Sequence, residues 1–232
     1  MLSRSNPRSA MRYRYCSIYL LLIAALALVG SAFVSSEAKA QNLGLVGDEG
    51  AEAVHVLNLS TNAVITTINL PSVGSAVGDV AITQDGTLGF VTTFDSFVYV
   101  IDLTQATPVL ASGTNPIPIS NPGEDFAVTP DGNYLTVADG STVNPLSVID
   151  IAARAEVDTE NLTASDQNSV SVCDDGVTVL AGSFNGGVVA SGFFDPSTGS
   201  LTATANTISV SLVNNVYCAP GSQTGIAISR LN

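Results

Sequence analysis

Three stretches of this sequence repeat one pattern: 79-DVAITQDG-86, 125-DFAVTPDG-132 and 169-SVSVCDDG-176. In each of them, apolar residues alternate with small or polar ones and lead into an Asp-Gly turn. Such alternation is typical of a β-strand, and Asp-Gly between two apolar runs is a strong hairpin signal. A degenerate fourth copy reads 214-NNVYCAPG-221. The pattern therefore predicts β-hairpins that recur along the chain.

The fifth residue of each copy gives the period of the repeat. Thr83, Thr129, Cys173 and Cys218 are separated by 46, 44 and 45 residues. Within a period, the turn is followed by a second strand, a third strand that ends in aspartate, and a short fourth strand, as in residues 88–111. Four strands in a period of this length are typical of one blade of a β-propeller. The strands of a β-sandwich have no reason to repeat their turn chemistry at this spacing, so we expect stacked blades.

The two ends of the repeat region predict an irregular ring. Residues 43–46 match a second strand and residues 55–59 match a third strand, so the repeats begin inside a blade. They end at 225–229, which again matches a second strand. Joining the ends would place five strands where four are expected. We therefore expect an all-β, β-propeller-like array of four-stranded antiparallel blades in an incomplete or irregular ring. Residues 41–232 would hold about three full blades plus partial blades at both ends.

The inner strands should pack close to the propeller axis. Their large residues alternate with Ala81, Ala127 and Ser171. We expect the large residues to be buried, because alternate side chains of a strand share one face. These residues are Val80, Ile82, Phe126, Val128, Val170 and Val172.

Residues 1–40 carry the three parts of an export signal. Four arginines precede an apolar run at 18–29, and Ala38-Lys39-Ala40 offers a small-x-small cleavage site. The run is shorter than the roughly 20 apolar residues of a spanning helix, so we expect cleavage between Ala40 and Gln41 and no stable membrane insertion afterwards. The alternative is a retained membrane anchor. The prediction is a secreted, periplasmic or cell-surface protein.

The chain that remains after cleavage is strongly acidic. Residues 41–232 keep Arg154 and Arg230 against nineteen acids, which gives a formal charge of −17. A field of this sign repels phosphate backbones, whose binding depends on Lys and Arg. Nucleic acid and anionic membrane surfaces are therefore poor candidate partners, and we expect no nucleic-acid partner. The charge serves solubility in the simplest interpretation, while a cationic ligand is the alternative.

Few residues carry recognisable chemistry. His55 is the single histidine, so a site with several histidine ligands is excluded, and its place in a third strand predicts a surface residue. Asp85, Asp131 and Asp175 belong to turns, where aspartate caps local backbone amides. Asp79, Glu124 and Asp125 begin inner strands and are the candidate metal ligands, because carboxylates that converge at a channel mouth can hold calcium. The alternative interpretation is that they are solvated acids.

Cys173 and Cys218 are the only cysteines left once residues 1–40 are removed. They take the same place in consecutive repeats, and an oxidising compartment would let them form a disulfide. The obstacle is distance, because a bridge needs Cα atoms within about 7 Å whereas packed sheets lie ~10 Å apart. The alternative is two small buried residues with free thiols.

Residues 122–150, PGEDFAVTPDGNYLTVADGSTVNPLSVID, resemble the YVTN-type repeat of bacterial β-propellers, which also occurs in lactonase-like and surface-protein propellers. The likeness is clear over 79–151, weaker over 43–70 and poor beyond 169. It implies a blade and does not by itself imply a function. We expect a non-catalytic binding or surface-interaction module for an unknown protein or small ligand. The alternatives are a lactonase-like hydrolase and a fragment of a longer propeller whose functional site is missing.

Overall fold

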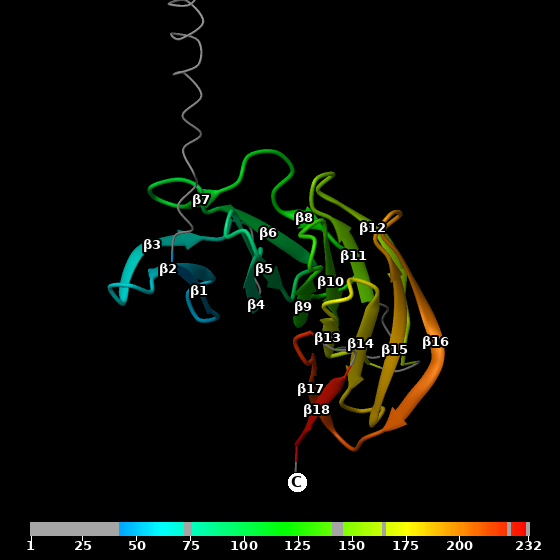
Figure 1. The fold of residues 1–232 in the computed structure, drawn as a ribbon. Helices are drawn as coiled ribbons and strands as arrows, with labels where there is room; N and C mark the ends of the chain where they lie inside the picture. The colour runs from blue at the N-terminus through cyan, green and yellow to red at the C-terminus, as the bar shows by residue number, and fades with distance from the viewer. Residues whose placement is uncertain (1–41, 72–75, 141–145, 164–165, 222–223, 231–232) are drawn as a thin grey trace, which may run out of the picture. The chain divides into compact units, whose positions relative to one another are not determined.

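The computed structural model describes residues 42–71, 76–140, 146–163, 166–221 and 224–230. The predicted export signal, with its cleavage site between Ala40 and Gln41, lies outside these residues. Residues 40–232 form one compact unit. Its described residues contain eighteen β-strands and no helix (Figure 1). No helix among them is long and apolar enough to cross a membrane.

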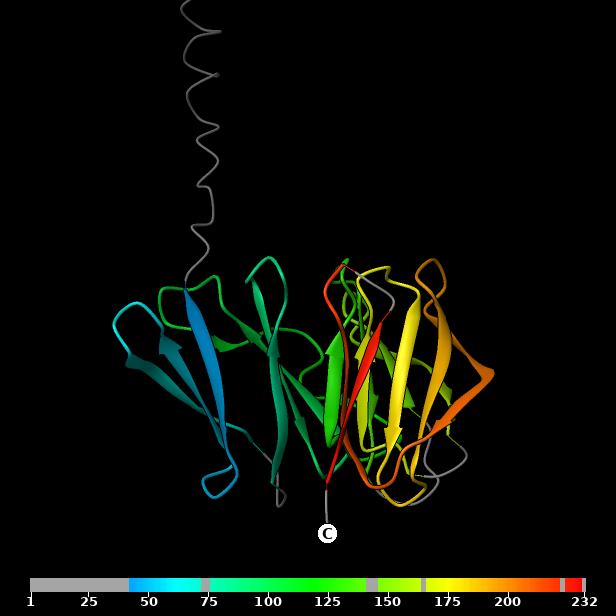
Figure 2. The same cartoon turned by 60° about the horizontal axis from the view of Figure 1, so that its bottom comes forward.

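The strands form five antiparallel sheets in chain order (Figure 2). The first sheet holds β1 (Leu43–Asp48), β2 (Ala53–Asn58) and β3 (Ala63–Asn69). The second holds β4 (Val77–Ile82), β5 (Leu88–Thr93), β6 (Phe97–Asp102), β7 (Val109–Leu110) and β8 (Ile117–Pro118). The third holds β9 (Asp125–Val128), β10 (Tyr134–Ala138), β11 (Leu146–Asp150) and β12 (Ala155–Glu160). The fourth holds β13 (Ser169–Val172), β14 (Thr178–Ser183), β15 (Val188–Asp195) and β16 (Ser200–Ser209), and the fifth holds β17 (Val213–Cys218) and β18 (Gly225–Ser229).

This arrangement confirms the predicted fold class. The third and fourth sheets are four-stranded meanders, and the first and fifth sheets are separate partial sheets of three and two strands. Within the described residues, β1 and β18 do not share a sheet, so the array is not closed by pairing of its ends. The chain enters and leaves the array at second strands, as the repeat pattern predicts.

The outer edge of the second sheet differs from the predicted single fourth strand. β6 pairs with β7 over one half of its length and with β8 over the other half. Between them, the side chain of Asn115 takes the place of a strand residue. Its Nδ2 donates to the carbonyl of Val100 at 2.7 Å, and its Oδ1 accepts from the Val100 amide at 3.0 Å. The Val100 carbonyl also accepts from the Ala111 amide at 2.8 Å, so the side chain is needed mainly as the acceptor for the Val100 amide.

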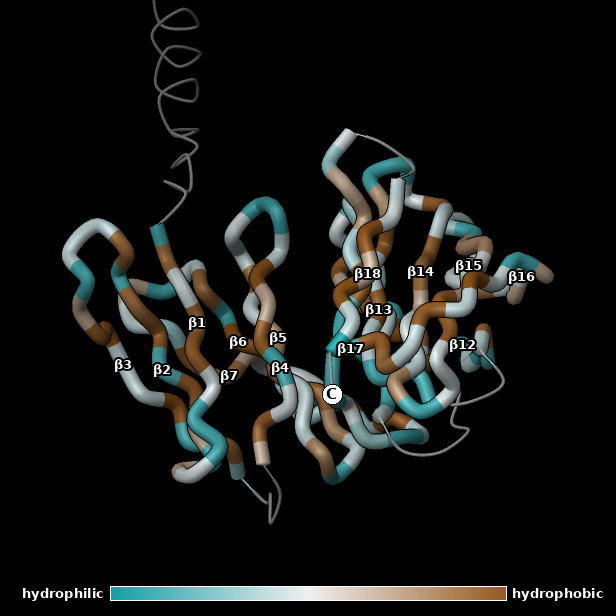
Figure 3. Tube along the Cα trace, turned by 90° about the horizontal axis from the view of Figure 1, so that it is seen from below, coloured by the Kyte–Doolittle hydropathy of each residue, from teal (hydrophilic) through white to brown (hydrophobic). Residues whose placement is uncertain are grey.

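Stacking of neighbouring sheets buries the core, and β6 shows how. Its Val98 and Val100 belong to the apolar cluster shared with the third sheet, whereas Tyr99 and Ile101 belong to the cluster shared with the first sheet. Successive side chains of a strand point to opposite faces, so one strand serves two interfaces. Figure 3 shows the apolar residues concentrated in the strands and polar residues in many of the turns.

The inner strands follow the expectation in part. Phe126 and Val170 are buried, and the other four large residues, Val80, Ile82, Val128 and Val172, are half-buried. None of the six is exposed. Thr83, Thr129 and Cys173, which directly follow the inner strands, are buried as well. The start of each of these three turns is therefore packed against the rest of the fold.

Cys173 and Cys218 form a disulfide in the structure, with Cα atoms 5.1 Å apart. Their positions in the strand ladder are not equivalent, which differs from the expectation. The amide of Cys173 donates to Thr178, but in the last hairpin the matching bond runs from Ala219 to Thr224. Cys218 is therefore the structural counterpart of Val172.

This offset explains why the two sulfur atoms meet. A shift of one residue turns a side chain to the other face of its strand. Cys218 consequently shares a face of β17 with Val216, which is buried next to Gly182 of the fourth sheet. An added Cβ at Gly182 would lie 2.7 Å from Val213 and 3.0 Å from Val216, so glycine is what allows this close approach. If the two cysteines held equal positions in the ladder, their side chains would lie on the same face of their respective sheets and would not point toward each other.

Candidate functional site

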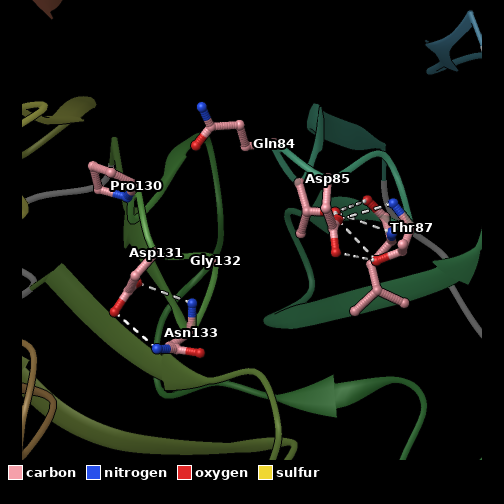
Figure 4. A pocket seen from close by; sticks show the side chains of 9 residues that line it. Gln84, Asp85, Thr87, Pro130, Asp131, Gly132 and Asn133 are labelled. Atoms are coloured by element: carbon pink, nitrogen blue, oxygen red, sulfur yellow. Dashed lines mark hydrogen bonds between the residues drawn. The ribbon is translucent and has the colours of Figure 1, made fainter. Parts of the chain in front are cut away.

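The β4–β5 turn and the β9–β10 turn line an open cavity of about 420 Å³. Figure 4 shows Asp85 and Asp131 on these two turns, each bonded to residues of its own turn. Asp85 accepts hydrogen bonds from the hydroxyls of Thr83 and Thr87 at 2.6 and 2.8 Å. Asp131 accepts from the hydroxyl of Thr129 at 2.6 Å and from Asn133.

These bonds keep the turn carboxylates ionised. The hydroxyl of Thr83 is the main cause that lowers the pKa of Asp85. Burial acts to raise the pKa of Asp131, but hydrogen bonds from Thr129 and Asn133 outweigh it and lower the pKa. The lone pairs of these carboxylates are committed to the fold, which confirms the prediction that they are turn residues. The turn cavity is therefore a poor candidate for chemistry.

At the opposite end of the inner strands lie two adjoining cavities of about 380 and 210 Å³. They share Glu124, Asn168 and Asn214, and we call the pair the mouth groove. Carboxyl and carboxamide side chains supply most of its polar lining. The lining residues are Glu49, Val77, Gly78, Asp79, Phe94, Glu124, Asp125, Gly140, Asp166, Asn168, Phe184, Asn185, Asn214, Asn215 and Arg230.

Asp79 and Asp125 meet in this groove. Their carboxyl groups, from the third residue of β4 and the first residue of β9, hydrogen-bond to each other. The prediction that Asp79 begins an inner strand is therefore wrong, because β4 already begins at Val77. Burial is the main cause that raises the pKa of Asp125 to about 7, and the charge of Asp79 adds to it. The pair consequently holds a proton at mildly acidic pH, because two carboxylates in contact resist ionising together. Asp125 also accepts from the Val170 amide of the next sheet at 3.0 Å.

Glu124 lies apart from this pair. A Cβ built at Gly140 would fall on the Glu124 carboxylate, so that carboxylate lies against Gly140. Burial raises the pKa of Glu124, and the charges of Asp139 and Asp166 raise it further. The structure thus divides the three candidate metal ligands into Asp79 with Asp125 on one side and Glu124 on the other. In the part of the chain that the structure describes, no three His, Cys, Asp or Glu side chains form a group that could hold a metal ion.

Sequence reasoning missed the asparagines of the mouth groove. Asn168 joins three segments, because its Oδ1 accepts from the Phe184 amide at 2.8 Å and its Nδ2 donates to the Asn214 carbonyl at 3.1 Å. The repeat held a signal for them, since Asn168 and Asn214 stand at or beside the positions taken by Asp79 and Asp125 in earlier copies. The first two copies place acids there and the last two place amides.

Asp166 was missed as well. It is buried and accepts from the Ser183 hydroxyl at 2.5 Å and from the Asn185 amide at 3.1 Å. These bonds hold the β14–β15 turn in place at the edge of the groove. Phe184 and Phe94 both follow directly after the second strand of their sheets, and both line the groove.

His55 lies on the first sheet and lines neither part of the mouth groove. It is half-buried, with Nδ1 2.8 Å from the Thr67 hydroxyl and Nε2 3.3 Å from the Asp48 carboxylate. Backbone hydrogen bonding from Ala51 is the main cause that lowers the pKa of Asp48, with His55 second. The three side chains come from adjacent strands β1, β2 and β3, so the contact is a cross-strand polar trio on a sheet face.

The chain matches no known family model and no curated protein. Its fold, however, is similar to many solved structures. Hydrazine synthase from Kuenenia stuttgartiensis aligns with a TM-score of 0.63 at 18% identity, over 75% of this chain and 49% of that one. A functionally unknown protein from Desulfotomaculum acetoxidans aligns with a TM-score of 0.65 at 16% identity, over 75% and 54% of the two chains.

A protein from Bacteroides fragilis that carries a provisional assignment as a 6-phosphogluconolactonase aligns with a TM-score of 0.64 at 17% identity, over 75% of this chain and 53% of that one. At such identities the likeness establishes the propeller-like fold alone. The chain spans about half the length of the solved structures it matches.

Proposed function

We propose that this propeller-like chain is an exported, non-catalytic binding module that holds an uncharged or cationic small ligand, or a protein loop of that character, in the mouth groove. The observation that carries the proposal is the lining of the groove. Carboxyl and carboxamide groups of five sheets face one cavity pair, whose one basic side chain among the described lining residues is Arg230.

The chemistry of these groups decides the class of ligand. An amide offers both donors and acceptors, and so does a carboxyl pair that shares one proton. Phe94 and Phe184 add apolar surface at two places along the groove. A phosphate-bearing ligand needs several basic partners, whereas Arg230 is the one basic side chain among the described lining residues and residues 41–232 carry a formal charge of −17.

Ligand binding is tested by thermal unfolding of residues 41–232 with a panel of neutral sugars and organic cations, and with inorganic phosphate and gluconate as anionic probes. A ligand that binds only the folded chain raises Tm. We expect stabilisation by a neutral or cationic compound and its loss in the Asn168→Ala variant. Asn133→Ala, on the opposite end of the inner strands, is the matched control. Stabilisation by the anions alone would contradict the proposal.

Export is tested separately, because binding and compartment are independent. The protein is expressed from its full sequence in a secreting host, and the N-terminus of the product outside the cytoplasm is determined. We expect a product that begins at Gln41. An uncleaved product that stays in the membrane fraction would favour the retained anchor instead.

A lactonase-like hydrolase is the second candidate. The observation that favours it is the Asp79–Asp125 pair, since a carboxyl group with a pKa of about 7 suits proton transfer near neutral pH. Assays of lactones and esters on the purified chain separate the candidates. Turnover that disappears in Asp125→Asn would overturn the non-catalytic proposal. The third candidate, a piece of a longer propeller, is tested by the genomic sequence that follows Asn232.

A further inference from the structure

Strand β18 is exposed along its whole length, unlike the second strands of the second, third and fourth sheets. β5, β10 and β14 are also second strands of their sheets, and all their residues are buried or half-buried. All five residues of β18 are exposed. Among the described residues, β17 is the one strand that pairs with it, and no described strand pairs with its other edge. An edge strand presents backbone donors and acceptors for pairing with another chain.

One face of the last sheet is apolar and exposed as well. Tyr217 and Ile226 are cross-strand partners, and Ile228 pairs with Asn215 on the same face. Tyr217, Ile226 and Ile228 are 50%, 54% and 49% exposed. The opposite face lies against the fourth sheet, because a Cβ at Gly225 would fall 2.5 Å from Leu180. An exposed apolar face beside a free strand edge is typical of an interaction surface.

The sequence of β18 is self-complementary for antiparallel pairing. Gly225-Ile226-Ala227-Ile228-Ser229 alternates small and large residues symmetrically about Ala227. A two-fold axis at Ala227 would set Ile226 opposite Ile228 of the other copy and Gly225 opposite Ser229. Cross-strand pairs of β-branched residues stabilise a sheet. The same geometry is isologous, which is the commonest form of a dimer interface.

Charge also favours this strand as the place where two copies meet. Residues 41–232 carry a formal charge of −17, so two copies repel each other over most of their surface. β18 has no charged residue, and the next residue, Arg230, has the opposite sign to the chain. The strand itself therefore adds no repulsion where two copies would meet. Repulsion between the copies is also screened by salt, since the Debye length falls to about 3 Å at 1 M.

We propose that a second copy of this chain docks on β18, and that the two β18 strands pair antiparallel about Ala227 to form a continuous β17–β18–β18–β17 sheet. This sheet has four strands, the number found in the complete blades of the same molecule. The interface lies beside the mouth groove, because Asn215, the cross-strand partner of Ile228, and Arg230 line that groove. The dimer is tested without added ligand, so the outcome does not depend on the ligand proposed for the groove.

Sedimentation velocity of residues 41–232, the unit that carries all eighteen described strands, tests the proposal. We expect a concentration-dependent dimer that tightens as sodium chloride rises from about 20 mM to about 500 mM, because salt screens the repulsion. The double variant Ile226→Lys with Ile228→Lys should weaken the dimer at least about tenfold, since like charges then face each other across the axis. The double variant Ile226→Glu with Ile228→Glu should do the same.

An equal mixture of the lysine and glutamate variants should recover the dimer, because the pairing sets position 226 of one copy opposite position 228 of the other. Val157→Lys, at an exposed apolar residue of β12, is the control and should leave the dimer unchanged. Thermal unfolding of each variant verifies that it is folded. A wild type that stays monomeric at high salt, a lysine variant that dimerises as the wild type does, or a mixture that fails to associate would each overturn the proposal.

Discussion

The two ends of the inner strands use aspartate in opposite ways. At the turn end, Asp85 and Asp131 accept hydrogen bonds from their own turns, and these bonds lower the pKa of both. At the mouth end, Asp79 and Asp125 face each other across two sheets, and burial raises the pKa of Asp125. Within the same repeat, aspartate is therefore ionised at the turn end and can stay protonated at the mouth end. What differs is the balance of causes: hydrogen bonds from the turn outweigh burial at Asp131, whereas burial, with the charge of Asp79 added, dominates at Asp125.

The largest expected effect comes from the disulfide, which joins the turn ends of β13 and β17. Replacing Cys173 and Cys218 together by alanine removes a link between residues 45 apart. The chain-entropy model gives a loss of roughly 4 kcal/mol in unfolding free energy for a loop of this length. Urea denaturation of the variant and of the wild type measures it. Intact mass after alkylation of the unreduced wild type provides the check: two alkylated thiols would show that no bridge forms.

The variant Thr129→Val tests how much the hydroxyl of Thr129 contributes to the stability of the fold at the turn end. The Thr129 hydroxyl donates to Asp131 and accepts from the Tyr134 amide at 3.0 Å, and the residue is buried. Valine keeps the shape but leaves the amide without this acceptor, so the unfolding free energy should fall by about 1–3 kcal/mol. Thr129→Ser is the control and should lose much less. Equal losses in the two variants would show that packing, and not the hydroxyl, matters here.

Asp125→Asn tests the mouth end through pH. The pKa of Asp125 is raised by folding, so its protonation stabilises the folded chain at acid pH, and this stability is lost as the pH rises through about 7. Each unit of pKa shift corresponds to about 1.4 kcal/mol, and partial solvation reduces the total to a few kcal/mol at most. Asparagine mimics the protonated acid at every pH. The unfolding free energy of the variant relative to that of the wild type should therefore be higher at pH 8 than at pH 5. Parallel pH profiles for the two proteins would rule out the shared proton.

Asp131→Asn should give the smallest effect and the opposite pH dependence. The pKa of Asp131 is lowered by folding, so its contribution is present above its ordinary value near pH 4 and disappears as the pH falls below it. The turn is exposed, and we expect a loss below about 1 kcal/mol at pH 7. Thermal unfolding at pH 7 and at about pH 3 measures the difference. If the variant is still less stable than the wild type at the lower pH, the charge of Asp131 is not what stabilises the turn.

The sequence alone predicted the features of the fold that depend on short-range interactions. The Asp-Gly turns, the hairpins that they join and the capping role of Asp85, Asp131 and Asp175 all depend on bonds that reach no more than five residues along the chain. The period of 44 to 46 residues then fixed the blade as the unit of the fold. It also predicted that the chain enters and leaves the array at second strands. Such features survive in any packing of the blades, because the residues that make them are neighbours in the sequence.

The tertiary structure decided the rest, because the remaining contacts join residues of different sheets. Glu124 and Asp125 are adjacent in the sequence, yet one lies against Gly140 and the other reaches Asp79 and Val170. Strand alternation separates neighbours in this way, and the sequence does not say which face meets which sheet. A one-residue shift in the last hairpin likewise turned Cys218 toward Cys173. The repeat set the spacing of these groups along the chain, whereas the ladder register and the stacking of sheets chose their partners.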